Sequence, residues 1–413
     1  MRVLILSHYY PPERGSVRYA HDLAHGLSAR GHEVTVIAEM PHFPMGRPYP
    51  GFGRWKPVVR DEQGVRVIRV PLVMGSNSQP VRRMLGFLTY MLSALPWICV
   101  MKRQDAVIAS IPPATVAILG LLSGIVHRRR YLALLRDIEP LRALTLRGLA
   151  HKRRGRLLLR AFHWIYRLAA HVIAVHENER AVLLRWGIPE PRITVIGHGI
   201  DVERWSSAAD TAPGPSIPRR TGRHLVVYAG TFGLVHGLPA LMESLADPRI
   251  AALPFDFVFA GDGQHRGVCE QFLQRQHPDH IRILPSVDPG EVPAVLAQAD
   301  LLLCSFRDDS DAALGTKFLE YCAAGKPIIV SGKSQAGLVV SQIGNGRACD
   351  AADRESLVRT LTDFASRPAY WRQQGQLGLE HARAHFAQRD RIDQWMTLLG
   401  TLPVGGAPTS RSK

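Results

Sequence analysis

The sequence LLLCSFRDDSDAALGTKFLEYCAAGKPIIV, residues 301–330, contains two short apolar runs separated by a segment of helix length. The runs at 301–306 and 327–330 are apolar at consecutive positions, which is typical of strands buried on both faces. The segment between them is long enough for a loop and a helix. Such a strand–helix–strand unit predicts two parallel strands in a sheet that helices cover on both sides.

The same alternation is found along most of the chain. In the second half, further strands are predicted at 225–229, 255–260 and 281–284. In the first half, strands are predicted at 3–7, 34–39, 65–70, 106–110, 131–136, 171–176 and 193–196. Segments with helical spacing separate these strands. The sequence therefore predicts an α/β protein with two Rossmann-like domains, each built on a parallel sheet.

A segment of small, polar and proline-rich residues, SSAADTAPGPSIP at 206–218, separates the two series of strands and is typical of a linker. A cleft between two such domains, at the carboxyl ends of strands, is where a ligand is expected. The predicted organisation is a first domain at 1–205, a linker at 206–222, a second domain at 223–384, a helix at about 385–402 that returns to the first domain, and a loose tail at 403–413.

The composition is that of a folded protein. Hydrophobic residues make up 46% of the 413 residues and charged residues 21%, which excludes a chain that is disordered throughout. The five cysteines have no C-x-x-C spacing, which argues against a disulfide scaffold and a zinc ribbon. The apolar run that follows Met1 is too short for a signal peptide. We therefore expect a cytoplasmic protein.

Positive charge is concentrated in the first half of the chain. Residues 1–210 contain 30 Lys and Arg against 15 Asp and Glu, whereas residues 211–413 contain 21 against 20. Residues 128–167 alone contain 12 basic and 2 acidic residues. This imbalance indicates an anionic partner, which composition leaves open as nucleic acid, anionic lipid or a phosphorylated substrate. A solvated arginine-rich surface is the alternative.

Residues 84–101 are apolar almost throughout and lie between Arg82-Arg83 and Lys102-Arg103. The length is at the lower limit for crossing a bilayer, and Pro96 lies inside the segment. We expect a buried or interfacial helix of the first domain. Together with the basic region it would rest on an anionic membrane surface.

Seven short motifs occur in order along the chain: RGH at 30–32, PHFPMGRPYPG at 41–51, RDIEP at 136–140, VIGHGID at 195–201, VYAGTFGLVHGL at 227–238, FAGDG at 259–263 and LGTKFLEYCAAGKP at 314–327. The series resembles the family-4 retaining glycosyltransferases, which have the GT-B fold of two Rossmann-like domains facing across a cleft. The first two motifs are similar to those of the subgroup that builds bacterial surface polysaccharides, which includes the N-acetylfucosamine transferases.

The resemblance implies a metal-independent glycosyltransferase of hexosyl or N-acetylhexosaminyl type. Such an enzyme moves a sugar from a nucleoside-diphosphate donor to an acceptor hydroxyl with retention. The implied acceptor is a glycan or polyprenyl-linked oligosaccharide of O-antigen, capsule or exopolysaccharide assembly. The implied location is the cytoplasmic face of the plasma membrane, with the protein bound peripherally.

The donor-binding residues follow from the last motifs. Glu320, near the start of a helix, suits hydrogen bonding to the ribose hydroxyls. The backbone amides of Gly315 and Thr316, with Lys317, suit the diphosphate. An exposed helical pair of Lys317 and Glu320 is the alternative. The remaining expected donor-binding residues are Gly15, Thr231, Gly261 and Asp262.

Three positions depart from the family pattern. Ala312 stands where the family has the first Glu of its E-x7-E pair, and Thr231 and His236 stand where it often has Arg and Lys. Because these cations are missing, we expect Lys317 and Arg14 to contribute more to binding of the diphosphate. The acidic residues Asp308, Asp309 and Asp311 lie near Ala312 and also form a D-x-D pattern. We expect this segment to be a polar loop, with no metal and no other cofactor.

Acceptor activation is expected from the first domain. The predicted catalytic residues are Arg136, which would offset charge on the leaving diphosphate, Asp137, which would orient Arg136 or bind an acceptor hydroxyl, and His42, a candidate base. His8 and Glu139 are further candidates beside them.

Two other functions remain open. One is a nucleotide-sugar epimerase of the same fold, although no acid/base set for it is evident. The other is a non-catalytic GT-B protein that binds a partner or a lipid, which the residues at 231, 236 and 312 favour and the 314–327 motif disfavours. Nucleic-acid binding is not expected, since no module for it is present.

Overall fold

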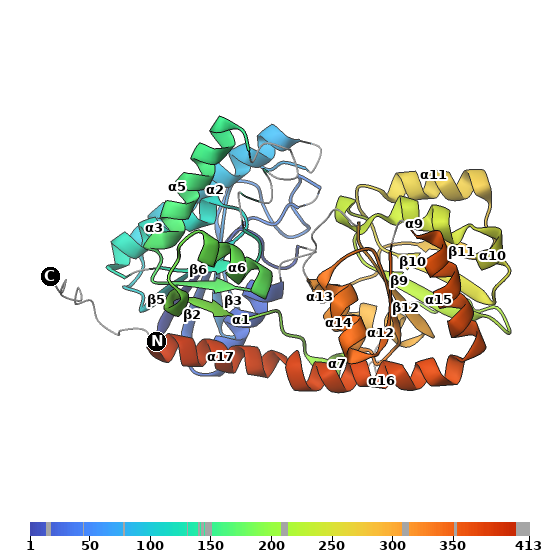
Figure 1. The fold of residues 1–413 in the computed structure, drawn as a ribbon. Helices are drawn as coiled ribbons and strands as arrows, with labels where there is room; N and C mark the ends of the chain where they lie inside the picture. The colour runs from blue at the N-terminus through green and yellow to red at the C-terminus, as the bar shows by residue number, and fades with distance from the viewer. Residues whose placement is uncertain are drawn as a thin grey trace. The chain divides into compact units, whose positions relative to one another are not determined.

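The structure is a computed structural model, and it describes residues 1–13, 18–43, 45–76, 79–129, 131–138, 141, 144, 151–207, 214–307, 314–350 and 353–401. The chain divides into two units (Figure 1). The first consists of Met1–His198 and Arg389–Lys413, and the second of Gly199–Gln388.

The first unit contains an eight-stranded sheet with the order β3-β4-β2-β1-β5-β6-β7-β8. The strands are β1 (Arg2–Ser7), β2 (Glu33–Glu39), β3 (Val58–Glu62), β4 (Val65–Val70), β5 (Ala106–Ile111), β6 (Tyr131–Leu135), β7 (His171–Ala174) and β8 (Ile193–Val195). All neighbours pair in parallel except β3 and β4.

The antiparallel strand β3 was not predicted from the sequence. It is an edge strand whose side chains are exposed or half-buried, so it lacks the apolar run by which the other strands were identified. Gln63 and Gly64 connect it to β4, and both have positive φ, as a two-residue hairpin turn requires.

Helices cover both faces of the first sheet. On one face, α2 (Pro80–Val100), α3 (Thr115–His127), α5 (Arg153–Leu168) and α6 (Glu177–Arg185) share a core with Leu4 and Leu6 of β1. On the other face, α1 (Arg18–Ala29) and the last helix, α17 (Gln388–Thr401), share a core with Val3 and Ile5.

The end of the chain is anchored in the first unit through α17. Trp395 Nε1 donates a hydrogen bond to Tyr19 Oη at 3.1 Å, and that hydroxyl donates to the carbonyl of Ile196 at 2.8 Å. Gly26 of α1 lets α17 approach closely, because a Cβ at that position would lie 2.4 Å from Ile392 Cδ1.

The second unit contains a six-stranded sheet, all parallel, with the order β11-β10-β9-β12-β13-β14. The strands are β9 (His224–Ala229), β10 (Phe255–Ala260), β11 (Ile281–Leu284), β12 (Leu301–Ser305), β13 (Ile328–Ser331) and β14 (Gly346–Cys349). The sequence missed β14, a short edge strand with two exposed residues.

Helices also cover both faces of the second sheet. One face packs against α7 (Val202–Ser206), α12 (Val292–Ala297), α13 (Gly315–Ala323), α14 (Gln335–Ile343) and α16 (Pro368–His385). The other packs against α9 (Leu238–Leu245), α10 (Pro248–Ala251), α11 (Arg266–Gln276) and α15 (Arg354–Ser366). Two parallel-sheet α/β units confirm the predicted fold class.

The order of the second sheet creates a switch point at β9. The chain proceeds from β9 through β10 to β11 on one side and then continues with β12, β13 and β14 on the other. The loops that follow β9 and β12 therefore diverge. In parallel sheets, ligands bind at this place, outside the carboxyl ends of the strands.

Candidate active site

Lys317 is the most unusual side chain at the switch point of the second unit. It lies in the first turn of α13, and its Nζ lies 3.8 Å from the centroid of the Tyr228 ring on β9. The Nζ atom is shielded from solvent and has no hydrogen-bond partner among the described residues. Burial lowers the pKa of Lys317 from 10.5 to about 8. At neutral pH it is therefore mainly a cation.

Gly230 makes room for this lysine. A Cβ atom at Gly230 would lie 2.5 Å from Lys317 Cε and 2.6 Å from Nζ, and the residue has a φ of +151°, which other residues rarely adopt. Its N–H donates to the carbonyl of Ala260 at 2.8 Å, which ties the ends of β9 and β10 together. Only a glycine fits between the strand end and the lysine.

The predicted residues Thr231, Gly261 and Asp262 lie at the same edge of the sheet. A Cβ at Gly261 would lie 1.8 Å from the carbonyl oxygen of Gly230, so the two loops touch through their backbones. Asp262 and Thr231 are exposed. The carboxylate of Asp262 accepts a hydrogen bond from the N–H of Gly263 at 2.7 Å, which shapes the turn.

Helix α13 begins at Gly315, whose φ is +69°, and the N-cap residue Leu314 has no side chain that can accept a hydrogen bond from this end. The N–H groups of its first turn have no partners within the helix, so this end can bind an anion. Tyr321 Oη accepts a hydrogen bond from the N–H of Ala229 at 2.9 Å and fixes the helix against β9. Glu320 is half-buried, one turn after Lys317. The structure thus brings the predicted residues 315–317 and 320 to one place.

His236 occupies a position where the resembled family often has a lysine, and it has a different role here. Its Nδ1 lies 3.1 Å from the carbonyl oxygen of Ser305, whose hydroxyl donates to the His236 carbonyl at 2.6 Å. Burial, and then the charge of Lys317, lower the pKa of His236 to about 3. The imidazole is therefore neutral and anchors its loop to the end of β12.

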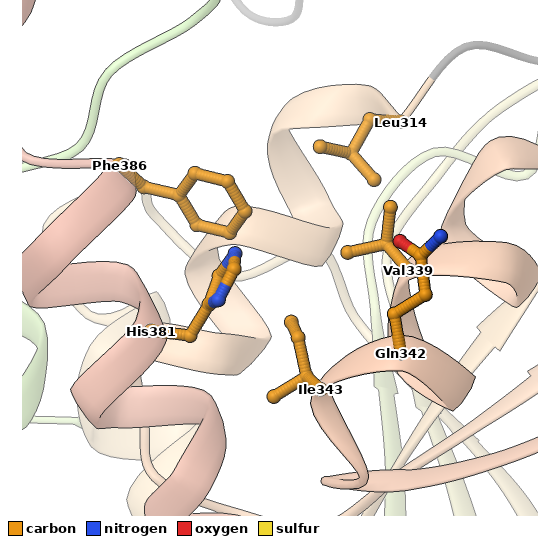
Figure 2. A pocket seen from close by; sticks show the side chains of 6 residues that line it. All are labelled: Leu314, Val339, Gln342, Ile343, His381 and Phe386. Atoms are coloured by element: carbon orange, nitrogen blue, oxygen red, sulfur yellow. The ribbon is translucent and has the colours of Figure 1, made fainter.

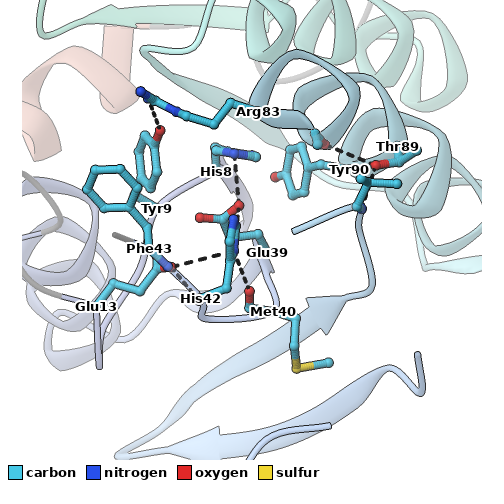
Figure 3. A network of polar contacts seen from close by, with 12 residues as sticks. His8, Tyr9, Glu13, Glu39, Met40, His42, Phe43, Arg83, Thr89 and Tyr90 are labelled. Carbon is cyan, nitrogen blue, oxygen red and sulfur yellow. Dashed lines mark hydrogen bonds and ion pairs between the residues drawn. The ribbon is translucent and has the colours of Figure 1, made fainter. Parts of the chain in front are cut away.

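A separate group of buried polar side chains lies in the first unit, at the carboxyl ends of β1 and β2 (Figure 3). His8 Nε2 lies 2.8 Å from Glu39 Oε2, and both residues are almost fully buried. Burial lowers the pKa of His8 to about 3, so the imidazole that faces Glu39 is neutral. Burial raises the pKa of Glu39 well above its usual value.

Glu13 completes this group. Its Oε1 accepts the N–H groups of His42 and Phe43, each at 2.8 Å, which fastens the loop after β2. Burial and the neighbouring Glu39 raise the pKa of Glu13 to about 9. At neutral pH the pair therefore retains a proton. We refer to His8, Glu13, Glu39 and His42 as the acidic cluster.

His42, the predicted base, belongs to the acidic cluster. Its Nδ1 lies 3.1 Å from the carbonyl oxygen of Met40, and the ring is buried. Burial lowers the pKa of His42 to about 4, so it is a neutral and weak base. Ligand atoms of Glu13, Glu39 and His42 lie within 4.8 Å of one another, an arrangement that is also able to hold a metal ion.

Arg136 and Asp137 follow β6. The N–H of Arg136 donates to the carbonyl of Ile111 at 2.9 Å, and its side chain is buried while that of Asp137 is half-buried. Burial lowers the pKa of Arg136, and Asp137 opposes this effect. Burial, and then the charge of Arg136, lower the pKa of His198 to about 4. The sequence analysis included His198 only as part of the motif at 195–201 and missed this electrostatic link.

Several predicted residues lie outside the described residues. They are Gly15, Arg14, Glu139, Asp308, Asp309, Asp311 and Ala312. Tyr228, Glu13 and Glu39 are the residues that the sequence analysis missed. Tyr228 reads as part of an apolar strand, and the two glutamates are joined only by the fold.

A pocket of about 220 Å³ adjoins the start of α13 (Figure 2). Leu314, Val339, Ile343 and Phe386 make it largely apolar, and Gln342 and His381 are its polar members. None of the predicted donor-binding residues lines it. It therefore does not account for the site at Lys317.

Comparison with known proteins agrees with this architecture. Residues 14–204 match Glycosyltransferase Family 4, and residues 215–378 match Glycosyl transferases group 1. The chain is 23% identical over 356 residues to the Escherichia coli (strain K12) protein named "Putative colanic acid biosynthesis glycosyl transferase WcaI", covering 82% of this chain and 85% of the relative.

Two further proteins are similar. The chain is 25% identical to the GDP-mannose:cellobiosyl-diphosphopolyprenol alpha-mannosyltransferase of Xanthomonas campestris over 246 residues, covering 56% of this chain and 60% of that protein. The structure of Anabaena HepE in complex with UDP-glucose aligns with a TM-score of 0.68 at 16% identity, covering 97% of this chain and 100% of that one. This last likeness concerns the fold.

Proposed function

We propose that this glycosyltransferase of the GT-B fold moves a sugar from a nucleoside-diphosphate donor to an acceptor hydroxyl, with retention at the anomeric carbon. The proposal starts from its two domains, which match Glycosyltransferase Family 4 and Glycosyl transferases group 1. The donor binds at the carboxyl ends of β9 and β12 in the second unit. The acceptor binds to the first unit.

Lys317 carries this proposal. A buried ammonium without a hydrogen-bonding partner is unfavourable unless a ligand supplies the partner. A diphosphate provides negative charge and several acceptor oxygens, and hydrogen bonds to such oxygens are among the strong ones. The uncapped start of α13 offers N–H donors beside the lysine. An anionic group at this place would therefore accept hydrogen bonds from both the Lys317 ammonium and the N–H groups at the start of α13.

Glu320 is proposed to bind the ribose. It lies three residues after Lys317 on α13, and residues at this spacing share one side of a helix. A carboxylate accepts hydrogen bonds from two neighbouring hydroxyl groups. HepE, with the same fold, was solved with UDP-glucose, which contains a ribose and a diphosphate.

We propose that donor binding needs no metal ion. Lys317 and the α13 N–H groups would neutralise the diphosphate directly. Neither Thr231 nor the neutral His236 adds positive charge, so Lys317 would provide a larger share of the binding free energy than in relatives with additional cations. Donor binding in the presence of a chelator tests this directly.

Arg136 and Asp137 are proposed to act on the acceptor side. Arg136 is buried and cationic, so it can offset negative charge that develops on the leaving diphosphate. Asp137, which raises the pKa of that guanidinium, would hold it in place. His42 is a weak base with a pKa of about 4, so we infer that the leaving phosphate, and not His42, accepts the proton of the acceptor hydroxyl.

The acceptor is proposed to be a lipid-linked oligosaccharide in cell-surface polysaccharide assembly at the cytoplasmic face of the membrane. The Xanthomonas relative is named for a diphosphopolyprenol-linked acceptor, and the Escherichia coli relative for colanic acid biosynthesis. Both hexoses and N-acetylhexosamines are candidates for the transferred sugar.

The test is a panel of nucleoside-diphosphate sugars, screened by thermal shift and calorimetry with EDTA present. A ligand at 100 times its Kd stabilises a protein by about 2.7 kcal/mol. One donor should stabilise the wild type and bind far more weakly to Lys317→Met. Lys326→Met, at a half-buried lysine just past the other end of α13, is the matched control and should bind normally.

Two results would contradict the proposal. If no donor stabilises the folded wild-type protein, the non-catalytic alternative is favoured. If Lys317→Met and Lys326→Met bind a donor equally well, the donor does not use Lys317. Once a donor is known, the anomeric configuration of the product, measured by NMR, tests retention.

A further inference from the structure

One side of the first unit has an exposed apolar surface along α2. Its exposed residues Val81, Leu85, Leu88, Leu92, Pro96 and Cys99 recur at helical spacing, so they form one stripe along the whole helix. Val81 is 67% exposed and Leu92 is 55% exposed. Met84 and Val100 lie beside the stripe and are also exposed. A monomeric soluble protein rarely exposes a continuous apolar surface of this kind.

The opposite face of α2 is firmly attached to the sheet. Tyr90 Oη donates a hydrogen bond to the carbonyl of Ile37 at 2.8 Å, and Thr89 Oγ1 accepts one from the N–H of Val73 at 2.9 Å. A Cβ atom at Gly86 would lie 2.6 Å from the carbonyl oxygen of Val73, so the backbones are in close contact.

This attachment determines how α2 can meet a membrane. Among the described residues, α2 is the helix that is long and apolar enough to cross a membrane by length and composition. A helix with one face packed against a sheet cannot be surrounded by lipid. It can lie in the interface with its free face buried among the lipids.

Basic side chains lie on the same side of the first unit as the stripe. Helix α3 packs against both α2 and α5, and the three helices form one side of the first unit (Figure 1). None of the three contains an Asp or Glu. On α5, the arginines at 153, 154, 156, 160 and 167 are exposed, together with Leu157 and Trp164. We refer to the exposed side chains of α2, α3 and α5 as the basic apolar face.

We propose that the basic apolar face binds the surface of an anionic phospholipid bilayer. Apolar side chains enter the headgroup boundary, while arginines beside them attract anionic lipids, and the two effects together give stable binding where either alone is weak. Trp164 suits the membrane interface. This inference depends on the surface alone and not on the nucleotide-sugar proposal.

The experiment is co-sedimentation of the full chain with vesicles that contain no acceptor lipid and no donor. One set is phosphatidylcholine alone, and the other contains about one third phosphatidylglycerol. The wild type should bind only the anionic set. Each removed arginine should weaken partitioning roughly fivefold, so Arg153→Gln/Arg156→Gln/Arg160→Gln should weaken it about a hundredfold. Leu88→Ser/Leu92→Ser should also lose binding, through the apolar contribution.

Matched controls come from exposed residues of the second unit. Arg275→Gln/Arg359→Gln/Arg372→Gln removes the same charge, and Val268→Ser/Leu338→Ser removes similar apolar area. Both should bind vesicles as the wild type does. Melting curves of all variants show that each one is folded.

Cys99 provides an independent readout. It is exposed and lies on the stripe, whereas the other four cysteines of the chain are buried. An environment-sensitive dye on Cys99 should shift its emission to the blue on anionic vesicles. The same dye on a Cys99→Ser/Gln274→Cys variant, on the second unit, should not.

Three outcomes would overturn the proposal. They are a wild type that does not bind anionic vesicles, equal losses in the control and test variants, or a dimer in solution that Leu88→Ser/Leu92→Ser converts to monomer. The last result would identify the basic apolar face as an interface between two copies of the chain.

Discussion

Each unit has buried titratable side chains near the carboxyl ends of its central strands. They are Lys317 in the second unit and the acidic cluster in the first. They differ in how their charge is compensated. In the acidic cluster the raised pKa values of Glu13 and Glu39 favour protonation, which lowers the charge, and Glu13 also accepts two backbone N–H groups. Lys317 stays mainly cationic above the Tyr228 ring without a hydrogen-bond partner in the described residues.

We propose that this difference separates a ligand site at Lys317 from a mainly structural group. Glu13 of the acidic cluster fastens the loop after β2, and protonation reduces the charge that the cluster offers to a ligand at neutral pH. A buried charge that lacks a partner lowers the stability of the free protein and is compensated when an anion binds. The comparison therefore predicts opposite consequences for neutralising substitutions in the two places.

The largest effect is expected from Lys317→Met. Removing one donor aimed at developing charge typically lowers kcat by about 10² to 10³-fold, and we expect a loss of this size. Because methionine removes a buried charge, the free energy of unfolding of the free protein should not fall. Steady-state kinetics and urea unfolding measure the two quantities. A large loss of stability would mean that Lys317 is structural, as the acidic cluster is.

The next effect is expected from Gly230→Ala. The added methyl group would displace Lys317, and alanine is strained at a φ of +151°. We expect a loss of about 2 kcal/mol in the free energy of unfolding and weaker donor binding.

Gly267→Ala is the control for that substitution, because nothing lies within 4 Å of a Cβ there. Alanine also favours the helix, so the control should be as stable as the wild type or more so. Chemical unfolding and calorimetry with donor compare the two. Equal stability of both variants would show that the contact between Gly230 and Lys317 is absent in solution.

A moderate effect is expected from pH on the acidic cluster. Folding raises the pKa of Glu13 from 4.5 to about 9, so the folded state binds more protons than the unfolded state between these values. Stability should therefore fall as pH rises through this window, by at most about 1.4 kcal/mol per pH unit for one proton.

Glu13→Gln retains an oxygen that accepts the two N–H groups but cannot titrate. Its melting temperature should fall less between pH 5.5 and 8.5 than that of the wild type, because the variant has one titrating group fewer in this window. Glu243→Gln, at an exposed glutamate, should follow the wild type. Parallel pH profiles for all three proteins would show that Glu13 is ionised in the folded state.

The smallest effect is expected from Thr231→Arg. This exposed position lies at the edge of the donor site, where an added cation would meet the diphosphate in a solvated setting. Exposed ion pairs contribute little, so donor affinity should rise by at most about fivefold. Thr231→Gln should leave the affinity unchanged. A much larger gain would mean that Lys317 supplies little of the charge compensation.

Much of the fold was predictable because it depends on local pattern. Apolar runs predicted β9, β10 and β12, whose residues are buried on both faces whatever their neighbours are. The strands β3 and β14 were missed because most of their residues are exposed or only half-buried and they contain no apolar run. The segment at 84–101 was predicted as a helix, but its exposed stripe became evident only when the sheet defined the buried face.

The residues of the candidate site also fall into some that local sequence could indicate and others that it could not. The motif at 314–327 was sufficient to select Lys317 and Glu320, because a helix start, a cation and a carboxylate at fixed spacing are local features. Nothing local indicated that Tyr228 lies beneath Lys317, or that Glu39 lies close enough to Glu13 to raise its pKa. Those facts depend on which strands become neighbours.

The order of residues along this chain was therefore enough to predict two parallel-sheet units and to select the residues that we propose bind a nucleotide sugar. The protonation of each group depends on burial, which brings together residues distant in sequence and removes them from water. Burial keeps His42 and His236 neutral. Burial also removes Lys317 Nζ from water, in a place where no described residue accepts a hydrogen bond from it. Desolvation is a property of the packed structure, so sequence spacing could not reveal it.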